Sequence, residues 1–111
     1  MPDPSTTIGL RMAPEVTYTV DEARALVPVV RAALLQLAVE RHRDEPSVDD
    51  VRALLEHLDS LGIVVRDVEE GLVDFPTVRD GERAWLCWKL SDGELGFWHS
   101  TREGFASRQP L

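Results

Sequence analysis

The residues best suited to chemistry lie in the last third of the chain, from Gly71 to Leu111. This segment holds all three tryptophans, all three phenylalanines, the single cysteine and one of the three histidines, in the runs GLVDFP, WLCW, GFWH and GFASRQP. Asp74, His99 and Glu103 carry the carboxyl and imidazole groups that bind divalent metal ions or act as general acids and bases. We therefore expect any site to lie in this segment.

Each of these groups also has a purely structural interpretation. Zinc sites need three or four ligands at recognisable spacings, and the patterns CxxC, HxxxH and HExxH are absent from the chain. A histidine after an aromatic strand, such as His99, is commonly a packing residue. Cys87, between a leucine and a tryptophan, is typical of a buried, inert thiol. A nucleophilic cysteine would need a nearby base, for which His99 is the candidate.

The C-terminal segment after Gly104 has the features of a docked tail rather than a loose end. Phe105 and Leu111 can anchor it, and the guanidinium of Arg108 has the planar fork that suits a carboxylate or phosphate. We expect Arg108 to pair with Asp74, whose apolar neighbours indicate a buried carboxylate. The alternatives are a pair with Glu103, or an Arg108 that faces a ligand groove. Asp74 could also cap its own backbone in a turn.

The elements that must position these residues begin with helices. Residues 1–16 are rich in Pro, Ser and Thr and predict a flexible N-terminal arm, which leaves 17–111 as a single domain. Thr19 and Glu22 predict a capping box, and apolar residues at three- and four-residue spacing follow it. Pro28 lies inside this pattern, where we expect it to kink the helix.

A second helix follows after a short polar turn. The first helix is expected to end near Arg43, and Ser47 predicts the N-cap of the second. Gly62 is the expected C-terminal stop. Two helices joined in this way predict an antiparallel helical hairpin.

The hydrophobic period then changes from helix to strand. Asp80-Gly81 and Asp92-Gly93 are strong hairpin turns. The sequence predicts four strands, the second of which is closed by Pro76: Ile63–Val68, Leu72–Phe75, Arg83–Leu90 and Glu94–His99. The expected fold class is α+β, a helical hairpin followed by a small antiparallel β-meander, in two layers.

The register of the last hairpin decides which side chains share a face. A two-residue turn at Asp92-Gly93 predicts cross-strand partners in three pairs: Trp88 with Phe97, Cys87 with Trp98, and Leu86 with His99. Cys87 and His99 would then lie on opposite faces, which weakens a metal site that uses both. A three-residue turn shifts the register by one and reverses the faces, so the two registers are alternatives.

In the two-residue register Trp85 and Trp98 lie together on the face that one helical hairpin cannot cover. An exposed pair of tryptophans is typical of an interface. We expect a homodimer contact or a second small core, or else a ligand or partner groove, on this face.

Composition excludes several classes of function. The chain has 111 residues and a net charge of −8, so it lacks the basic face that nucleic acids or anionic membranes require. No apolar run approaches the roughly 20 residues that span a bilayer. One cysteine cannot form an internal disulfide, and the N-terminus does not have the pattern of a signal peptide. These features predict an acidic, cytoplasmic protein.

The chain also resembles a known family. Tyr18-Thr19, then GLVDFP, LCW, a WH pair and the ending GFASRQPL occur in the order seen in the bacterial family called domain of unknown function 2203. The resemblance covers about residues 17–111. Members typically carry GFAGRQP, where this chain has Ser107, and often have an acidic residue soon after the WH pair, near Arg102 and Glu103 here. The resemblance implies a compact cytoplasmic bacterial protein and names no activity.

Two hypotheses for function follow. The first is a homo-oligomeric binding module with its site on the C-terminal sheet and tail, and its candidate ligand-binding residues are Asp74, Trp98, His99 and Arg108. The second is a small metal- or acid/base-dependent enzyme that uses Asp74, His99, Glu103 and Arg108, the first three being the candidate metal ligands. Convergence of these side chains around a cleft would favour the enzyme. An Arg108 closed on Asp74, with no cleft, would favour the module. The sequence identifies no substrate, and no cofactor beyond a divalent metal ion.

Overall fold

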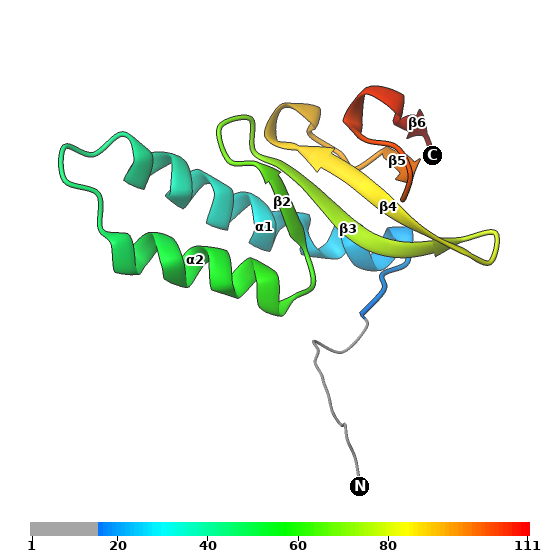
Figure 1. The fold of residues 1–111 in the computed structure, drawn as a ribbon, viewed down its shortest axis with the longest axis horizontal. Helices are drawn as coiled ribbons and strands as arrows, with labels where there is room; N and C mark the ends of the chain where they lie inside the picture. The colour runs from blue at the N-terminus through cyan, green and yellow to red at the C-terminus, as the bar shows by residue number, and fades with distance from the viewer. Residues whose placement is uncertain (1–15) are drawn as a thin grey trace, which may run out of the picture.

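The computed structural model describes residues 16–111, which form two helices and a five-stranded antiparallel sheet of order β2-β3-β4-β5-β6 (Figure 1). The helices are α1 (Val20–Arg41) and α2 (Val48–Ser60), and the strands are β2 (Val64–Asp67), β3 (Leu72–Arg79), β4 (Glu82–Lys89), β5 (Phe97–Ser100) and β6 (Gln109–Pro110). Two short 3₁₀ helices are η1 (Leu90–Asp92) and η2 (Phe105–Ser107). The predicted α+β fold is confirmed. The predicted N-terminal arm lies almost wholly outside the described residues.

Helix α1 begins where the capping signals predict. The Thr19 hydroxyl accepts a hydrogen bond from the backbone N–H of Glu22, and the Glu22 carboxylate accepts one from the Thr19 N–H. Pro28 lies inside α1 without ending it, because buried residues on both sides of it, Val27 and Val30, hold the helix against the core. Neither helix of the described chain is long and apolar enough to span a lipid bilayer.

A buried carboxylate, which the sequence did not single out, holds the connection between the helices. Glu40 accepts hydrogen bonds from the backbone N–H of Ser47 (3.1 Å) and from the guanidinium of Arg43 (2.9 Å). Ser47 in turn caps α2 through Asp50, as predicted. Gly62 ends α2 with a positive φ of 75°. The predicted helical hairpin is therefore confirmed, with α1 ending at Arg41.

Strand β3 is longer than predicted, because it continues through Pro76 to Arg79. The carbonyl of Pro76 accepts a hydrogen bond from the Tyr18 N–H at 2.8 Å. Pro76 lies beyond Asp74, the last residue of β3 that pairs with β2, so no residue of β2 lies opposite it. The nitrogen and carbonyl of one residue point to the same side of a strand. The absence of an N–H at Pro76 therefore removes no hydrogen bond between strands. The turn that follows β3 is the predicted one, with Asp80 and Gly81 both at positive φ.

The connection from β4 to β5 is longer than a two-residue turn. The register predicted from a two-residue turn is therefore wrong. Lys89 and Trp88 hold the loop: the Lys89 N–H donates to Asp92, and the Trp88 indole N–H donates to the Gly93 carbonyl. Leu95 is buried in the core, and the loop therefore extends past it before β5 starts. The observed pairs are Cys87 with Phe97, Leu86 with Trp98, and Trp85 with His99. The shift of one residue is the alternative register, and it places Cys87 and His99 on the same face.

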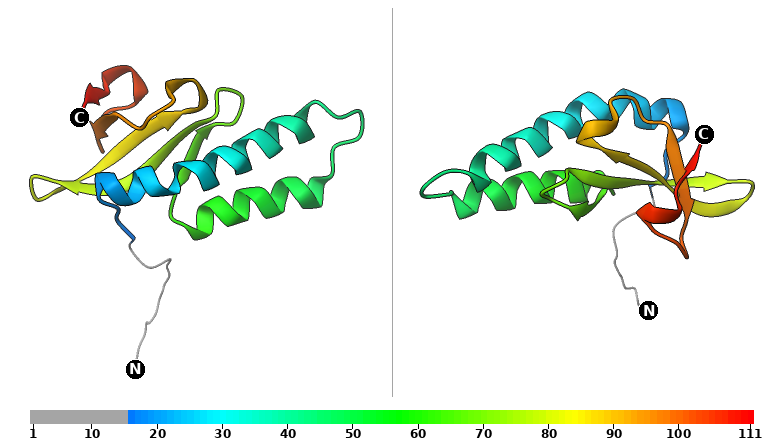
Figure 2. Two further views of the ribbon diagram at one scale, coloured as in Figure 1. Left: turned by 180° about the vertical axis from the view of Figure 1, so that it is seen from behind. Right: turned by 90° about the horizontal axis from the view of Figure 1, so that it is seen from above.

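The two faces of the sheet have different roles. One packs against α1 and carries the largest buried apolar side chains, among them Phe75, Leu86 and Trp88. We call the other face the open face, because neither α1 nor α2 covers it (Figure 2). It carries Asp74, Trp85, Cys87, Phe97 and His99. The tail crosses one edge of it, where β6 pairs with β5.

Gly71 is a strict requirement of the β2–β3 turn that brings these strands together. Its φ is +66°, and a Cβ placed there would lie 2.5 Å from the side chain of Leu90. Its carbonyl also accepts a hydrogen bond from the Leu90 N–H.

We expect Gly71→Ala to lower the free energy of unfolding by roughly 2–4 kcal/mol, through backbone strain and overpacking. Gly96→Ala is the matched control, because its φ is not positive and no atom lies within 4 Å of the added Cβ. Urea denaturation measures both changes. Equal losses for the two variants would show that the turn is not constrained in this way.

Candidate functional site

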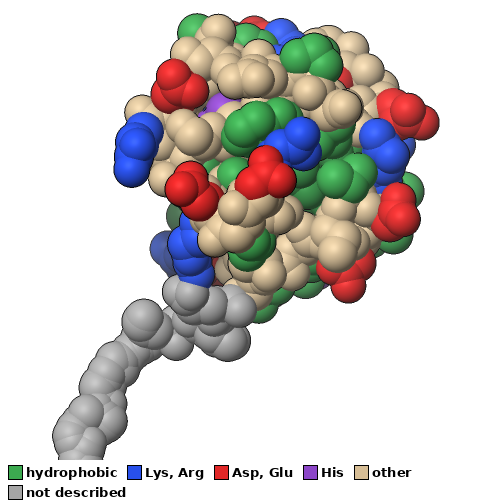
Figure 3. Space-filling model, turned by 90° about the vertical axis from the view of Figure 1, so that its right-hand side faces the viewer, with side chains coloured by type: hydrophobic (Ala, Val, Ile, Leu, Met, Phe, Trp, Pro, Cys, Tyr) green, Lys and Arg blue, Asp and Glu red, His purple; other side chains and the backbone are tan. Residues whose placement is uncertain are grey.

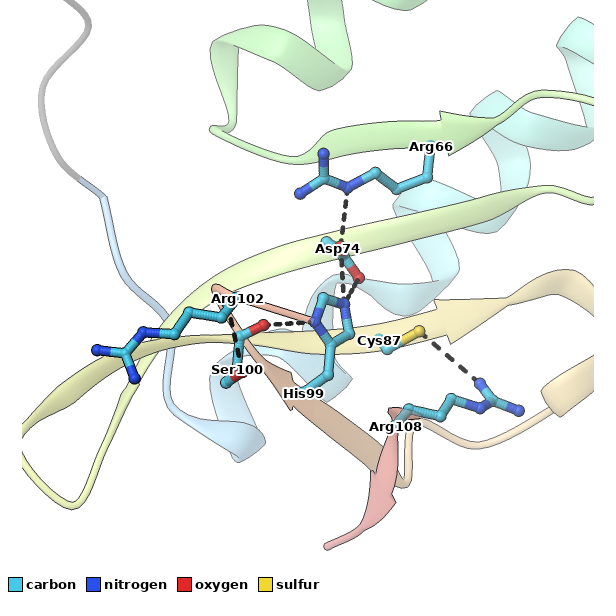
Figure 4. A network of polar contacts seen from close by, with 7 residues as sticks. All are labelled: Arg66, Asp74, Cys87, His99, Ser100, Arg102 and Arg108. Carbon is cyan, nitrogen blue, oxygen red and sulfur yellow. Dashed lines mark hydrogen bonds and ion pairs between the residues drawn. The ribbon is translucent and has the colours of Figure 1, made fainter. Parts of the chain in front are cut away.

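Three buried polar side chains meet on the open face, one from each of three neighbouring strands (Figure 4). Asp74 of β3, Cys87 of β4 and His99 of β5 are 1%, 1% and 3% exposed. Asp74 and Cys87 are direct cross-strand partners, and His99 lies two pairs further along β4, opposite Trp85 and on the same face. One ligand atom from each residue lies within 4.8 Å of the other two. We call these three residues the polar cluster.

The hydrogen bonds of His99 fix the position of its ring. Nδ1 lies 2.8 Å from the carbonyl oxygen of Ser100, and Nε2 lies 3.0 and 3.1 Å from the two oxygens of Asp74. A carbonyl can only accept, so Nδ1 carries a proton and donates it. Nε2 then either donates to an ionised Asp74 or accepts from a protonated one. Both ring nitrogens are therefore engaged within the protein.

Asp74 has a third partner, Arg66 of β2, whose Nε donates to Oδ2 at 2.9 Å. A β-bulge between Val65 and Asp67 locally breaks the β2–β3 register at Arg66. The guanidinium of Arg66 also lies 5.0 Å from the ring centroid of Trp85. Arg66 therefore orients the Asp74 carboxylate and forms part of the same surface.

Cys87 is a protonated thiol at neutral pH. Burial raises its pKa to about 11, and the neighbouring charge of Asp74 acts in the same direction, against a smaller opposing effect of Arg108. The nearest Arg108 nitrogen is 3.9 Å from the sulfur. A nucleophilic cysteine needs a lowered pKa, so the thiol by itself fits the inert interpretation.

A pocket of about 310 Å³ opens onto the polar cluster. Its walls are apolar, formed by Leu72, Trp85 and Phe105, and its rim carries polar and charged residues, among them Arg66, Thr101, Arg102 and Glu103. The face of the molecule seen in Figure 3 carries apolar side chains interspersed with charged side chains of both signs. The site thus combines a polar floor, apolar walls and a charged rim.

Comparison with known proteins gives one match. A family model described as "Uncharacterized conserved protein (DUF2203)" matches residues 36–111, more than half of the chain. The chain belongs to this family. No curated protein and no solved structure matches it. The description of the DUF2203 family names no activity, so a function for this member must be argued from its site.

The structure of this DUF2203 protein brings together only some of the predicted site residues. Asp74 and His99 are in contact, but Glu103 lies at the exposed rim, with its carboxylate 3.5 Å from the Ser100 hydroxyl. Trp98 lies on the core-facing side of the sheet, where the guanidinium of Arg79 stacks on it at 4.5 Å. The expectation that Trp85 and Trp98 share an open face is therefore wrong, because the register differs by one residue.

Arg108 is docked as predicted but has a different partner. Its guanidinium makes two bonds to the carboxylate of Asp92, at 2.7 and 3.0 Å, and stacks on the rings of Phe97 and Phe105. Burial alone would raise the pKa of Asp92, but the bonds from Arg108 and from the Lys89 N–H lower it below its usual value. The predicted pair with Asp74 is wrong, because Arg66 and His99 already occupy that carboxylate.

The residues predicted to bind a ligand or metal do not include Cys87 and Arg66, which the structure adds to the site. The register of a two-residue turn places Cys87 on the face opposite His99. Arg66 has no local signal that singles it out, since the predicted strand Ile63–Val68 also contains a second charged residue, Asp67. Its contact with Asp74 depends on the bulge, which local sequence patterns do not predict.

The Arg108–Asp92 pair should be a major support of the tail, since the two side chains are only 14% and 8% exposed. We expect Arg108→Ala to lower the free energy of unfolding by about 3 kcal/mol, because it leaves a buried carboxylate without its partner. Arg41→Ala is the matched control, since its ion pair with the exposed Glu69 contributes little. Chemical denaturation compares the two. Similar, small losses would contradict a buried pair.

Proposed function

We propose that this DUF2203 protein is a binding module, and that its ligand is a small molecule with a carboxylate or phosphate group, bound in the pocket of the open face. The observation that carries the proposal is the pocket itself. Ligand sites are typically concave, apolar on their walls and furnished with a few converging polar groups. The polar cluster, the walls of Leu72 and Trp85 and the charged rim fit that description.

The charge of the rim supports an anionic ligand. Only the Nε of Arg66 is used by Asp74, and its two terminal nitrogens donate to no acceptor among residues 16–111. The side chain of Arg102 likewise forms no ion pair within that range, and in Figure 4 it points away from the polar cluster. Two guanidinium groups outnumber the single rim carboxylate of Glu103, in a chain whose net charge is −8. Such groups bind carboxylates and phosphates in bidentate fashion.

The enzyme hypothesis requires four side chains to come together, and two of them do. Asp74 and His99 do meet beside a pocket, whereas Glu103 and Arg108 do not join them. Acid/base chemistry needs a nitrogen that can reach the substrate, and both nitrogens of His99 are engaged within the protein. The binding module therefore accounts for more of the site than an acid/base enzyme does.

Isothermal titration of metal-free protein, kept in a chelator, tests the ligand class with phenyl phosphate, benzoate and the neutral benzyl alcohol. We expect the two anions to bind and the alcohol not to. Arg66→Gln and Arg102→Gln should each weaken binding of the anions about tenfold or more, which corresponds to about 1.4 kcal/mol. Arg52→Gln, on the exposed face of α2, is the control and should leave binding unchanged. Equal binding of the alcohol, or an unaffected Arg66→Gln, would contradict the proposal.

We also propose that the module is a homodimer. The sequence-based argument for a dimer, a shared face of Trp85 and Trp98, does not hold, because the two side chains lie on opposite faces of the sheet. The apolar surface that supports this proposal lies on α2, where Val48, Val51 and Leu55 form a shallow groove bordered by Arg52, Glu56 and Asp59. Val48 is 67% exposed. A second copy of α2, packed antiparallel about a two-fold axis near Leu54, would place Arg52 of each chain beside Glu56 of the other. The surface is thus complementary to itself, as a two-fold interface requires.

A charge exchange tests this interface by sedimentation at micromolar concentration. Arg52→Glu and Glu56→Arg should each weaken the dimer several-fold, because like charges would then face each other across the axis. The double variant should restore the dimer mass. A wild-type chain that sediments as a monomer, or single variants that dimerise as well as wild type, would overturn the proposal.

A cytoplasmic location is also proposed. It is supported by the single cysteine, Cys87, which is buried and free. A reducing compartment keeps such a thiol in the form that the structure shows.

A further inference from the structure

We propose that Asp74, Cys87 and His99 together bind one transition-metal ion of the zinc class at the floor of the pocket. This inference deepens the proposed function, since it rests on the pocket being the binding site of the module. The three residues supply an oxygen, a sulfur and a nitrogen, each buried, and these atoms lie within 4.8 Å of one another. The candidate metal set predicted from the sequence contained Glu103, and the structure puts Cys87 in its place.

The separations suit a small ion. Zinc binds sulfur at about 2.3 Å and nitrogen or oxygen at about 2.0–2.2 Å, so tetrahedral ligands lie about 3.4–3.6 Å apart. Nε2 of His99 is 3.1 Å from Oδ1 of Asp74, slightly closer than that. Small side-chain rotations that widen this contact and bring in the sulfur would accommodate the ion. All three residues project from the same face of three neighbouring strands of one sheet, so the ion requires movement of side chains rather than of strands.

The groups around the polar cluster hold its side chains as the surroundings of a metal site do. Histidines that bind metals usually donate their second ring N–H to a carbonyl or carboxylate. Here Nδ1 of His99 donates to the carbonyl of Ser100, which directs Nε2 toward Asp74 (Figure 4), and a ligand atom of Cys87 lies within 4.8 Å. Arg66 holds Oδ2 of Asp74, so Oδ1 is the oxygen best placed for the ion. The orientation of each ring and carboxylate is thus set before metal binds.

The donor set indicates the class of metal. A thiolate and an imidazole favour zinc, cobalt and similar transition metals, whereas calcium and magnesium prefer oxygen ligands. Zn²⁺ would be neutralised by the carboxylate of Asp74 and the thiolate of Cys87. Binding breaks the S–H bond of Cys87 and forms a metal–sulfur bond. The thiol proton, and the proton that Asp74 shares with Nε2 of His99, pass to solvent.

Three protein ligands leave a fourth position open, and Asp74, Cys87 and His99 all line the pocket. Zinc sites of this composition hold water or an exogenous ligand at the open position. An oxygen of the proposed carboxylate or phosphate ligand would occupy it, while Arg66, which also lines the pocket, contacts the remaining oxygens. The metal would thereby define where the ligand's charged group binds.

Cobalt spectroscopy of the full chain, stripped with a chelator and dialysed, gives the most direct test. Cys87 is the only cysteine, so a thiolate-to-cobalt charge-transfer band reports its coordination alone. We expect one Co²⁺ per chain with this band, and none in Cys87→Ser. Competition with a chromophoric chelator should show that Asp74→Asn and His99→Gln weaken Zn²⁺ binding at least about 100-fold. The exposed His57→Ala is the control and should bind as wild type does.

The outcomes separate this inference from the proposed function. A folded wild-type chain without the charge-transfer band, or a His99→Gln variant that binds Zn²⁺ as tightly as His57→Ala, overturns the metal site. Circular dichroism identifies variants that fail to fold, and the wild-type cobalt spectrum then decides alone. If phenyl phosphate binds in chelator but the band is absent, the metal site is wrong and the ligand pocket stands. If the band appears but no anion binds, the metal site stands and the ligand pocket is wrong.

Discussion

The cross-strand register of β4 with β5 is the constraint on which the site depends. Side chains alternate between faces along a strand, so a shift of one residue would move His99 to the core side and separate it from Cys87. The register is set on the opposite face, where Leu86 and Trp88 are buried and the Trp88 indole holds the carbonyl of Gly93. The apolar core therefore determines which polar side chains meet on the open face.

The polar cluster is unusual because it is buried on a face that neither α1 nor α2 covers. Burying a carboxylate is costly unless its oxygens are paired, and Asp74 meets this requirement through His99 and Arg66. The tail closes one side of the same face, where Arg108 stacks on Phe97 and pairs with Asp92. The pocket lies between the tail and β2. The ion pairs and ring contacts on either side of it stabilise the open face and leave the pocket itself accessible.

The two layers of the fold divide these tasks. Helix α1 buries the apolar side of the sheet, and the hairpin of α1 and α2 extends beyond the strands (Figure 1). The sheet and tail carry the pocket, and they lie wholly within the part of the chain that matches the DUF2203 family, residues 36–111. The proposed ligand site and the proposed dimer surface occupy different elements, the sheet with its tail and α2. The two proposals can therefore be tested independently of each other.

Local chemistry in the sequence was enough to determine the helical hairpin, its caps, the turn at Asp80-Gly81 and the α+β class. Each of these depends on residues within a few positions of one another, such as Thr19 with Glu22. It also indicated that Asp74 and His99 belong to one site. Only the tertiary structure decided the register that adds Cys87, the bulge that adds Arg66 and the partner of Arg108. These depend on contacts between residues distant in sequence, whose energies are set by the packing of the whole sheet and not by any local pattern.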